Sequence, residues 1–254
     1  MILSYHRPAT VPEALALLEK GKDYIPVGGG STLEHHQGDI HVVDLQSLGF
    51  NKIEVQGEKT IVGATTKLED LLHHFASQHD FKSAISIEAS RNQREQATIG
   101  GVVCSSDGRS PLLTLLSTLD LQMEWLPGNF TVSIGDYLAQ RSFWNRARLV
   151  TKFILDNRVE YRYESIGRSP LDTPMISLGI AHWTSGRLRV VTGGFGSIPS
   201  LILDGNAKDD VLQALSLALA EASDQWASAD YRIHAAQKLA TRMLIDLDIT
   251  SGEG

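Results

Sequence analysis

The segment Tyr24-Ile-Pro-Val-Gly-Gly-Gly-Ser-Thr-Leu33 places three consecutive glycines directly after a short strand-like run. Glycine has no Cβ, so it tolerates positive φ and lets a ligand come close to the backbone. Consecutive N–H groups turned into one concavity bind anions, and Ser31 and Thr32 add hydroxyl groups. A structural turn is the simpler explanation of a lone triple glycine. The GxGxxG spacing of a Rossmann fold is absent here.

A second pair of glycines lies about seventy residues further on, in Ala97-Thr-Ile-Gly-Gly101. Small and polar residues follow from Val102 to Asp107, with side chains that can hydrogen bond to a sugar chain or a ring edge. Each glycine loop follows a segment with β-strand character. Two such loops indicate one elongated ligand held at two places, as a dinucleotide would be.

The pattern of apolar residues predicts an α+β protein. Residues 1–50 have the pattern of a small β-α-β unit, in which Thr10 caps the helix. Alternation and helical spacing predict further elements. In chain order they are strands at 52–56 and 59–63, helices from 68 to 75, 84 to 90 and 111 to 116, a hairpin of 121–125 with 129–133, a strand at 187–192, and helices at 209–222 and 229–246.

The composition excludes several classes of protein. Hydrophobic residues make up 42% and charged residues 21% of the chain, which is ordinary for a globular protein. The net charge of −7 argues against a nucleic-acid partner, because neutralising phosphates requires a surface rich in Lys and Arg. The N-terminus lacks a signal-peptide pattern, and no apolar run approaches the roughly 18 residues of a membrane span. We therefore expect a cytoplasmic protein with no membrane span.

Cys104 is the single cysteine, which excludes an internal disulfide, a Cys-ligated zinc site and an iron–sulfur cluster. We expect it to be a small packed residue and not a reactive thiol. The histidine pairs at 35–36 and 73–74, with His79, lie in polar stretches, so we expect no metal site.

Several motifs, taken in order, resemble the FAD-binding subunit of the xanthine dehydrogenase and carbon monoxide dehydrogenase family. They are Tyr5-His-Arg-Pro8 with Glu13-Ala14, Val27-Gly-Gly-Gly-Ser-Thr-Leu33, Ile61-Val-Gly-Ala-Thr-Thr66, Arg94-Glu-Gln-Ala-Thr-Ile-Gly-Gly101, Gly193-Gly194 with Pro199, and Ser228-Ala-Asp-Tyr-Arg232. The resemblance runs almost from end to end. The two glycine loops together with the C-terminal Ser-Ala-acid-Tyr-Arg signature make it specific.

This resemblance implies a vanillyl-alcohol-oxidase-like (PCMH-type) FAD-binding domain of two α/β subdomains, followed by a C-terminal antiparallel sheet with helices. We expect the FAD-binding domain over residues 1–157, with subdomains of about 1–50 and 51–157, and the C-terminal domain over 158–254. The residues expected to bind FAD are Val27, Gly28, Gly29, Gly30, Ser31, Thr32 and Leu33 in the first loop, and Thr98, Ile99, Gly100, Gly101, Val102 and Asp107 in and after the second.

Proteins of this family work with a large molybdopterin subunit and a small subunit that carries [2Fe–2S] clusters. The resemblance therefore implies that this chain relays electrons through FAD to NAD⁺ or another acceptor, and that it needs no catalytic side chain of its own. Two positions depart from the family pattern. Val102 stands where members usually have Asn, and Glu164 aligns with a position that is basic in many members. The second departure weighs against efficient reaction with NAD⁺.

Two other functions remain open on the sequence. A stand-alone flavin oxidoreductase of the same broad fold would turn over a substrate without partners. A non-catalytic assembly subunit that has lost its flavin would account for Val102 and Glu164.

Overall fold

The computed structural model describes residues 1–31, 33, 38–141, 147–169, 172–206 and 210–249. The chain divides into two compact units. Unit 1 contains Met1–Phe75, Ala89–Ser105 and Leu121–Leu155, and unit 2 contains Ala76–Glu88, Ser106–Asp120 and Asp156–Gly254. Each unit is therefore assembled from segments that are distant in sequence.

Unit 1 begins with a parallel sheet in the order β1-β3-β2. Its elements are β1 (Ile2–His6), α1 (Val11–Leu18), β2 (Tyr24–Val27) and β3 (Ile40–Asp44), followed by a short 3₁₀ helix, Gln46–Leu48. The hydroxyl of Thr10 accepts a hydrogen bond from the N–H of Glu13, which caps α1 as expected. Ala14 and Leu18 of α1 pack with Val43, so the predicted β-α-β unit is confirmed.

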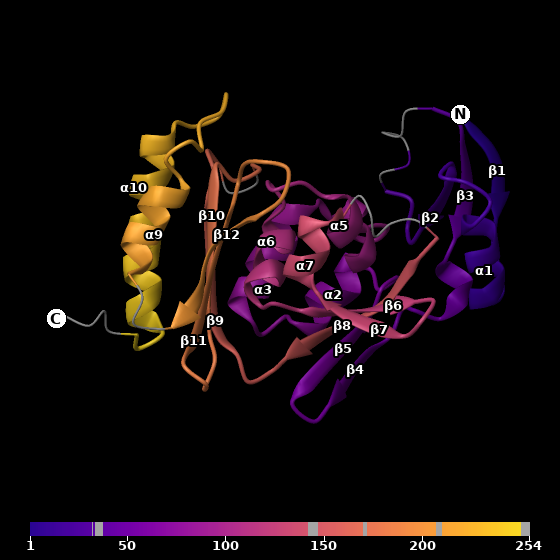
Figure 1. Cartoon of the computed structure of the whole chain (residues 1–254), viewed down its shortest axis with the longest axis horizontal. Coiled ribbons are helices and arrows are strands. Elements are labelled where there is room, and N and C mark those ends of the chain that lie inside the picture. Colours follow the sequence, from indigo (N-terminus) through magenta and orange to yellow (C-terminus); the bar gives the residue numbers. More distant parts are fainter. Residues whose placement is uncertain (32, 34–37, 142–146, 170–171, 207–209, 250–254) are drawn as a thin grey trace. The chain divides into compact units, whose positions relative to one another are not determined.

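The second sheet of unit 1 has the strand order β4-β5-β8-β6-β7 (Figure 1). Its strands are β4 (Ile53–Gln56), β5 (Lys59–Gly63), β6 (Gln122–Leu126), β7 (Phe130–Ser133) and β8 (Leu149–Asp156). The helices of this unit are α2 (Leu68–His74), α4 (Arg91–Arg94), α5 (Ile99–Ser105) and α7 (Ile134–Ala139). Strands β6 and β7 pair antiparallel, so the expected hairpin is confirmed.

The second glycine element was expected to be a loop after a segment with β-strand character, and this was wrong. It follows helix α4 and enters α5 at Ile99. Gly100 and Gly101 are poor helix formers, so the sequence gives little sign of this helix. Backbone hydrogen bonds to the segment 64–66 offset this low helix propensity at the start of α5. The N–H of Ile99 donates to the carbonyl of Thr66 at 3.0 Å, and that of Gly100 donates to Ala64 at 2.9 Å.

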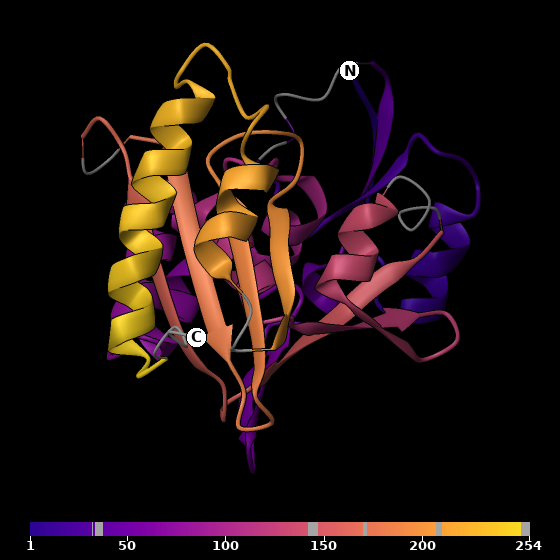
Figure 2. The same cartoon turned by 60° about the vertical axis from the view of Figure 1, so that its left-hand side comes forward.

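Unit 2 is built on an antiparallel sheet in the order β12-β11-β10-β9. Its strands are β9 (Glu160–Ile166), β10 (Ile176–His182), β11 (Arg187–Gly193) and β12 (Ser200–Asn206). Its helices are α3 (His79–Glu88), α6 (Pro111–Thr118), α9 (Val211–Ala218) and α10 (Ala229–Asp246). Helices α3 and α6 pack on one face of the sheet, while α9 and α10 cover the other (Figures 1 and 2). The antiparallel sheet with helices expected here is confirmed.

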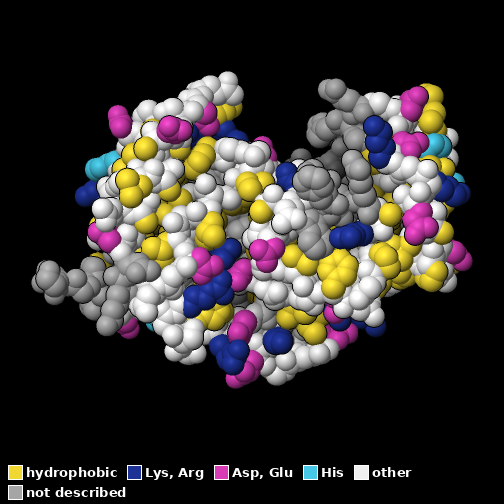
Figure 3. Space-filling model, viewed as in Figure 1, with side chains coloured by type: hydrophobic (Ala, Val, Ile, Leu, Met, Phe, Trp, Pro, Cys, Tyr) yellow, Lys and Arg dark blue, Asp and Glu magenta, His cyan; other side chains and the backbone are white. Residues whose placement is uncertain are grey.

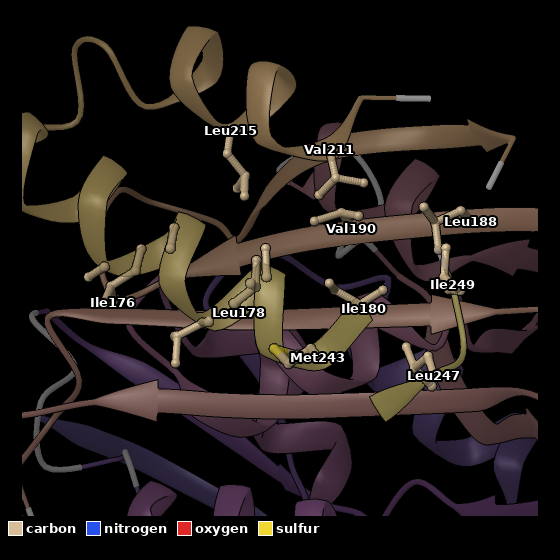
Figure 4. Close-up of a cluster of buried hydrophobic side chains, with 14 of the residues drawn as sticks. Ile176, Leu178, Ile180, Leu188, Val190, Val211, Leu215, Met243, Leu247 and Ile249 are labelled. Atoms are coloured by element: carbon tan, nitrogen blue, oxygen red, sulfur yellow. The ribbon is translucent and has the colours of Figure 1, made fainter. Parts of the chain in front are cut away.

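The core of unit 2 lies between the sheet and the two C-terminal helices (Figure 4). Ile176, Leu178 and Ile180 alternate along β10 and face Met243 of α10, and all four are completely buried. Burial of each such side chain stabilises the fold by about 1.5–3 kcal/mol. The core therefore holds α10, which carries the C-terminal signature, against the sheet.

Acidic and basic side chains are interspersed on the face drawn in Figure 3. In unit 2 one such group joins β11 and β12, where Arg187 donates hydrogen bonds of 2.7 Å to Asp120 and to Asp204. The hydrogen bond from Arg187 holds the pKa of Asp204 below its usual range. Both carboxylates are therefore engaged by arginine.

Candidate functional site

The first glycine loop follows the end of β2. The N–H of Leu45 donates to the carbonyl of Val27 at 2.9 Å, which fixes the point where the loop leaves the sheet. Gly30 has φ +79°, a conformation that favours glycine. In the described part of the chain, the N–H groups of residues 28–31 donate no hydrogen bond to protein. These donors remain available to an anionic ligand.

The second glycine loop lies against the first. A Cβ on Gly29 would overlap the carbonyl oxygen of Gln96, and a Cβ on Gly28 would lie 2.6 Å from Oγ1 of Thr98. The Thr98 hydroxyl in turn accepts a hydrogen bond from the N–H of Gly101 at 3.1 Å. The first loop therefore needs glycine where it contacts the second, and Gly100 of the second is required by Ala64, whose carbonyl oxygen would lie 2.6 Å from an added Cβ.

The two loops open into one cavity of about 560 Å³ within unit 1. The residues that line it are Lys22, Tyr24, Ile25, Pro26, Val27, Gly28, Gly29, Gly30, Ser31, Leu33, Leu45, Ala64, Thr65, Thr98, Gly100, Gly101, Cys104, Ser105, Trp125, Arg148, Leu149 and Val150. The lining combines apolar and aromatic walls with a few polar groups, which is typical of cofactor sites.

Most of the predicted site residues line this cavity, but three of those that the structure describes do not. Ile99 and Val102 are not among the lining residues, and both are buried. Thr32 lies outside the described residues. Asp107 belongs to unit 2, where its carboxylate accepts a hydrogen bond from the N–H of Arg109 at 2.9 Å. The FAD-binding role stays a prediction for every one of the predicted site residues, including those that line the cavity.

Thr65 is a lining residue that the sequence analysis did not single out. Its side chain is 6% exposed, and its hydroxyl has no hydrogen-bond partner among the described residues. A buried hydroxyl without a partner costs about 1–3 kcal/mol, so such groups occur where a ligand completes the hydrogen bond. The available signal was the motif Ile61-Val-Gly-Ala-Thr-Thr66, which contains Thr65 but does not show which threonine faces the cavity.

Lys22 and Arg148 are the basic side chains among the residues that line the cavity. They favour a ligand with negative charge. Cys104 also lines it, and burial raises the pKa of its thiol, although a hydrogen bond with Tyr137 opposes the shift. The thiol is therefore protonated near neutral pH and is not a nucleophile.

The histidines of the sequence analysis are dispersed. In unit 1 His73 lies 3.6 Å from a carboxylate oxygen of Glu69, and in unit 2 His79 lies 3.5 Å from one of Asp80. His35 and His36 fall outside the described residues. Within the described ranges, no three His, Cys, Asp or Glu side chains come together as metal ligands would.

Glu164, the position expected to be basic, lies on β9 and is paired with Arg242 of α10. A hydrogen bond of 3.0 Å joins Nε of Arg242 to this carboxylate. Arg232 of the C-terminal signature is completely buried. Its guanidinium donates to Asp224 at 2.8 Å and to the carbonyl of Met175 at 2.9 Å, which makes it a structural residue of unit 2.

Two adjoining glycine loops open into a mainly apolar cavity, and the N–H groups of residues 28–31 in the first loop donate no hydrogen bond among the described residues. This arrangement fits a protein that holds an elongated, phosphate-bearing cofactor. Comparison with known proteins specifies the cofactor. A family profile described as "FAD binding domain in molybdopterin dehydrogenase" matches residues 1–155. The chain therefore belongs to this family of FAD-dependent oxidoreductase subunits.

Individual proteins agree with this assignment. The chain is 27% identical over 246 residues to the uncharacterized protein YgfM of Escherichia coli K12, and the match covers 91% of each chain. Reconstituted CO dehydrogenase from Oligotropha carboxidovorans contains a similar fold, with a TM-score of 0.78, 25% identity, and 95% of this chain and 96% of that chain covered. Quinoline 2-oxidoreductase from Pseudomonas putida 86 shares the fold at TM-score 0.75 and 18% identity, over 96% and 95% of the two chains.

Among the residues that the structure describes, no helix is both long and apolar enough to cross a membrane. A cytoplasmic location stays a prediction.

Proposed function

We propose that this chain is the electron-relay subunit of a molybdenum-dependent hydroxylase, holding FAD in the cavity between its two glycine loops. The observation that carries the proposal is the convergence of three features on one cavity. Among the described residues, the N–H groups of residues 28–31 donate to no protein acceptor, the hydroxyl of Thr65 has no partner, and Gly29 lies in close contact with the second loop.

Each feature has a separate part in holding the cofactor. The N–H groups of residues 28–31 donate to the diphosphate, as such groups do in anion nests. The hydroxyl of Thr65 donates to a phosphate or ribityl oxygen and gains the partner that it lacks in the protein. Lys22 and Arg148 balance the negative charge of the diphosphate. Bound FAD supplies the redox chemistry, since it exchanges electrons both singly and in pairs.

The partners proposed for the chain are a molybdopterin subunit, where substrate is oxidised, and a [2Fe–2S] subunit that delivers electrons. The support is the fold that the chain shares with a component of CO dehydrogenase and with quinoline 2-oxidoreductase. The transfer of electrons from FAD to NAD⁺ or another acceptor stays a prediction. In unit 2 the ion pair with Arg242 neutralises Glu164, the acid at the position that is basic in many family members.

Purification through a tag on this chain, under mild conditions in its native host, tests the proposal. The expected product contains FAD, iron and molybdenum in constant ratio through a sizing column. FAD without the two metals would contradict the partnership and favour a stand-alone flavin oxidoreductase. Iron and molybdenum without FAD would favour the assembly subunit that has lost its flavin.

A further inference from the structure

A second cavity, of about 440 Å³, lies within unit 2 and shares no lining residue with the cavity of the glycine loops. It is lined by Arg109, Arg168, Asp172, Thr173, Met175 and Trp226. The guanidinium of Arg109 stacks over the Trp226 ring, 4.7 Å from its centroid, and that of Arg168 lies 5.4 Å from the same centroid. The indole is 43% exposed, so the group is open to solutes.

The two arginines differ from the others in this unit. Each of the remaining arginines that the structure describes in unit 2 donates to a carboxylate or a backbone carbonyl, namely Arg158, Arg162, Arg187, Arg189, Arg232 and Arg242. The guanidiniums of Arg109 and Arg168 have no such partner within the described ranges. Asp172 lines the same cavity but forms no ion pair with either of them there. Two like charges therefore lie within roughly 10 Å of each other, and among the described residues neither is paired with a carboxylate, that of Asp172 included.

The cavity walls are held in place by hydrogen bonds. Asp224 accepts from the N–H of Trp226 at 2.8 Å and from the buried guanidinium of Arg232. Arg232 also donates to the carbonyl of Met175, another lining residue. The N–H of Gly108 donates to the carbonyl of Gly196 at 3.1 Å, and this hydrogen bond fixes the loop that carries Arg109. The site is thus organised before any ligand arrives, which lowers the entropic cost of binding.

We propose that Arg109, Arg168 and Trp226 form a binding site for the phosphate group of a small molecule. Guanidinium groups bind phosphate oxygens in bidentate fashion, and one phosphate carries enough charge to neutralise both arginines. The cavity exceeds the size of one phosphate, so the free part of the indole is available to the rest of the ligand. The residues of this site differ from those that line the FAD cavity, and the inference does not depend on the proposed electron relay.

Calorimetric titration with inorganic pyrophosphate, at constant ionic strength and with saturating FAD, tests the site. Wild-type protein is expected to show saturable binding. Arg109→Gln and Arg168→Gln should each weaken it at least about tenfold, because each removes charge-assisted hydrogen bonds. Arg158→Gln is the matched control, since Arg158 of the same unit is paired with Asp156 outside the cavity, and it should bind as wild type does.

Tryptophan fluorescence gives a second measurement that does not depend on the arginine variants. Pyrophosphate should change the emission of the wild-type protein, and Trp226→Phe should remove that change. Absence of saturable binding, or unchanged affinity in both Arg109→Gln and Arg168→Gln, would overturn the proposal, and equal affinity for citrate would overturn the assignment to phosphate. If the protein binds no FAD, the same titration can be carried out without FAD and still compares these variants. Failure of the FAD-binding proposal is therefore distinguishable from failure of the phosphate-site proposal.

Discussion

At the scale of single residues, Thr65 and Thr66 form a natural matched pair. Both side chains are more than nine-tenths buried and both hydroxyls lack partners among the described residues, but only Thr65 lines the FAD cavity. Thr65→Val is nearly isosteric and should raise the Kd for FAD about five- to tenfold, because a hydrogen bond to a charged ligand is lost. Thr66→Val should leave that Kd unchanged. Flavin fluorescence quenching measures both constants.

The stability of the two apoproteins checks this interpretation. Each valine removes an unsatisfied buried hydroxyl, so neither variant should unfold at a lower temperature than wild type without FAD. An equal loss of FAD affinity in both variants would show that Thr65 acts through packing and not through its hydroxyl.

The carboxyl group of Glu88 in unit 2 should make the stability of the protein depend on pH. Its carboxylate accepts hydrogen bonds from the Ser110 hydroxyl at 2.6 Å and from the N–H of Leu112 at 3.0 Å, at the start of α6. Burial raises the pKa of Glu88, although these hydrogen bonds oppose the shift. A carboxyl whose pKa is higher in the folded state contributes stability at low pH, and that contribution is lost as pH rises through the folded pKa.

Glu88→Gln keeps an acceptor for both donors and removes the titration. We expect the variant and wild type to be equally stable near pH 4, with the variant becoming the more stable of the two as pH rises through the folded pKa. Thermal unfolding at several pH values measures the difference. A wild-type protein that gains stability over Glu88→Gln as pH rises would contradict the sign of the shift.

At the scale of elements, α10 depends on Arg232 for its N-terminal anchor. The guanidinium is completely buried and donates to Asp224, Met175 and Ala227. Arg232→Gln should destabilise the protein by about 3 kcal/mol, since breaking a buried charged network leaves polar groups unsatisfied. Arg242→Gln, on the same helix, breaks an exposed pair with Glu164 and should cost less than about 1 kcal/mol. Urea unfolding followed by circular dichroism compares them, and equal losses would contradict the anchoring role.

The sequence predicts helices and strands well where apolar residues recur at regular spacing. It predicts them poorly where tertiary contacts determine the backbone conformation. The helix expected at residues 229–246 has those bounds in the structure, because its apolar spacing is regular and Ser228 caps it. The start of α5 was missed, since Ile99 and Gly100 are held there by hydrogen bonds to Thr66 and Ala64, and Gly101 by one to the Thr98 hydroxyl. Similarly, the sequence shows the glycine loops of the site but not that Thr65 faces the cavity, since tertiary packing decides which side chain is enclosed.

At the scale of the whole molecule, chain order and spatial grouping differ. Residues 76–88 and 106–120 precede the C-terminal sheet by many residues, yet they belong to unit 2. Their helices, α3 and α6, pack on β9, β10 and β11. The spacing of apolar residues predicts that a helix has a buried face, but it does not predict which sheet covers that face. The predicted boundary near residue 157 follows chain order alone, and it stays a prediction.

The two units also lead to a prediction about unfolding. The FAD cavity lies in unit 1, so FAD should stabilise that unit directly, by about 2.7 kcal/mol at a free concentration of one hundred times Kd. Calorimetric scans with and without FAD should therefore show the transition of unit 1 moving to higher temperature. A scan that FAD leaves unchanged would contradict binding in this cavity.

The central claim is that this chain binds FAD, and an absorption spectrum of the purified protein between about 300 and 550 nm tests it most directly. We predict flavin bands in the protein and, after acid release, FAD and not FMN in the supernatant. A colourless protein that cannot be reconstituted with added FAD would contradict the claim.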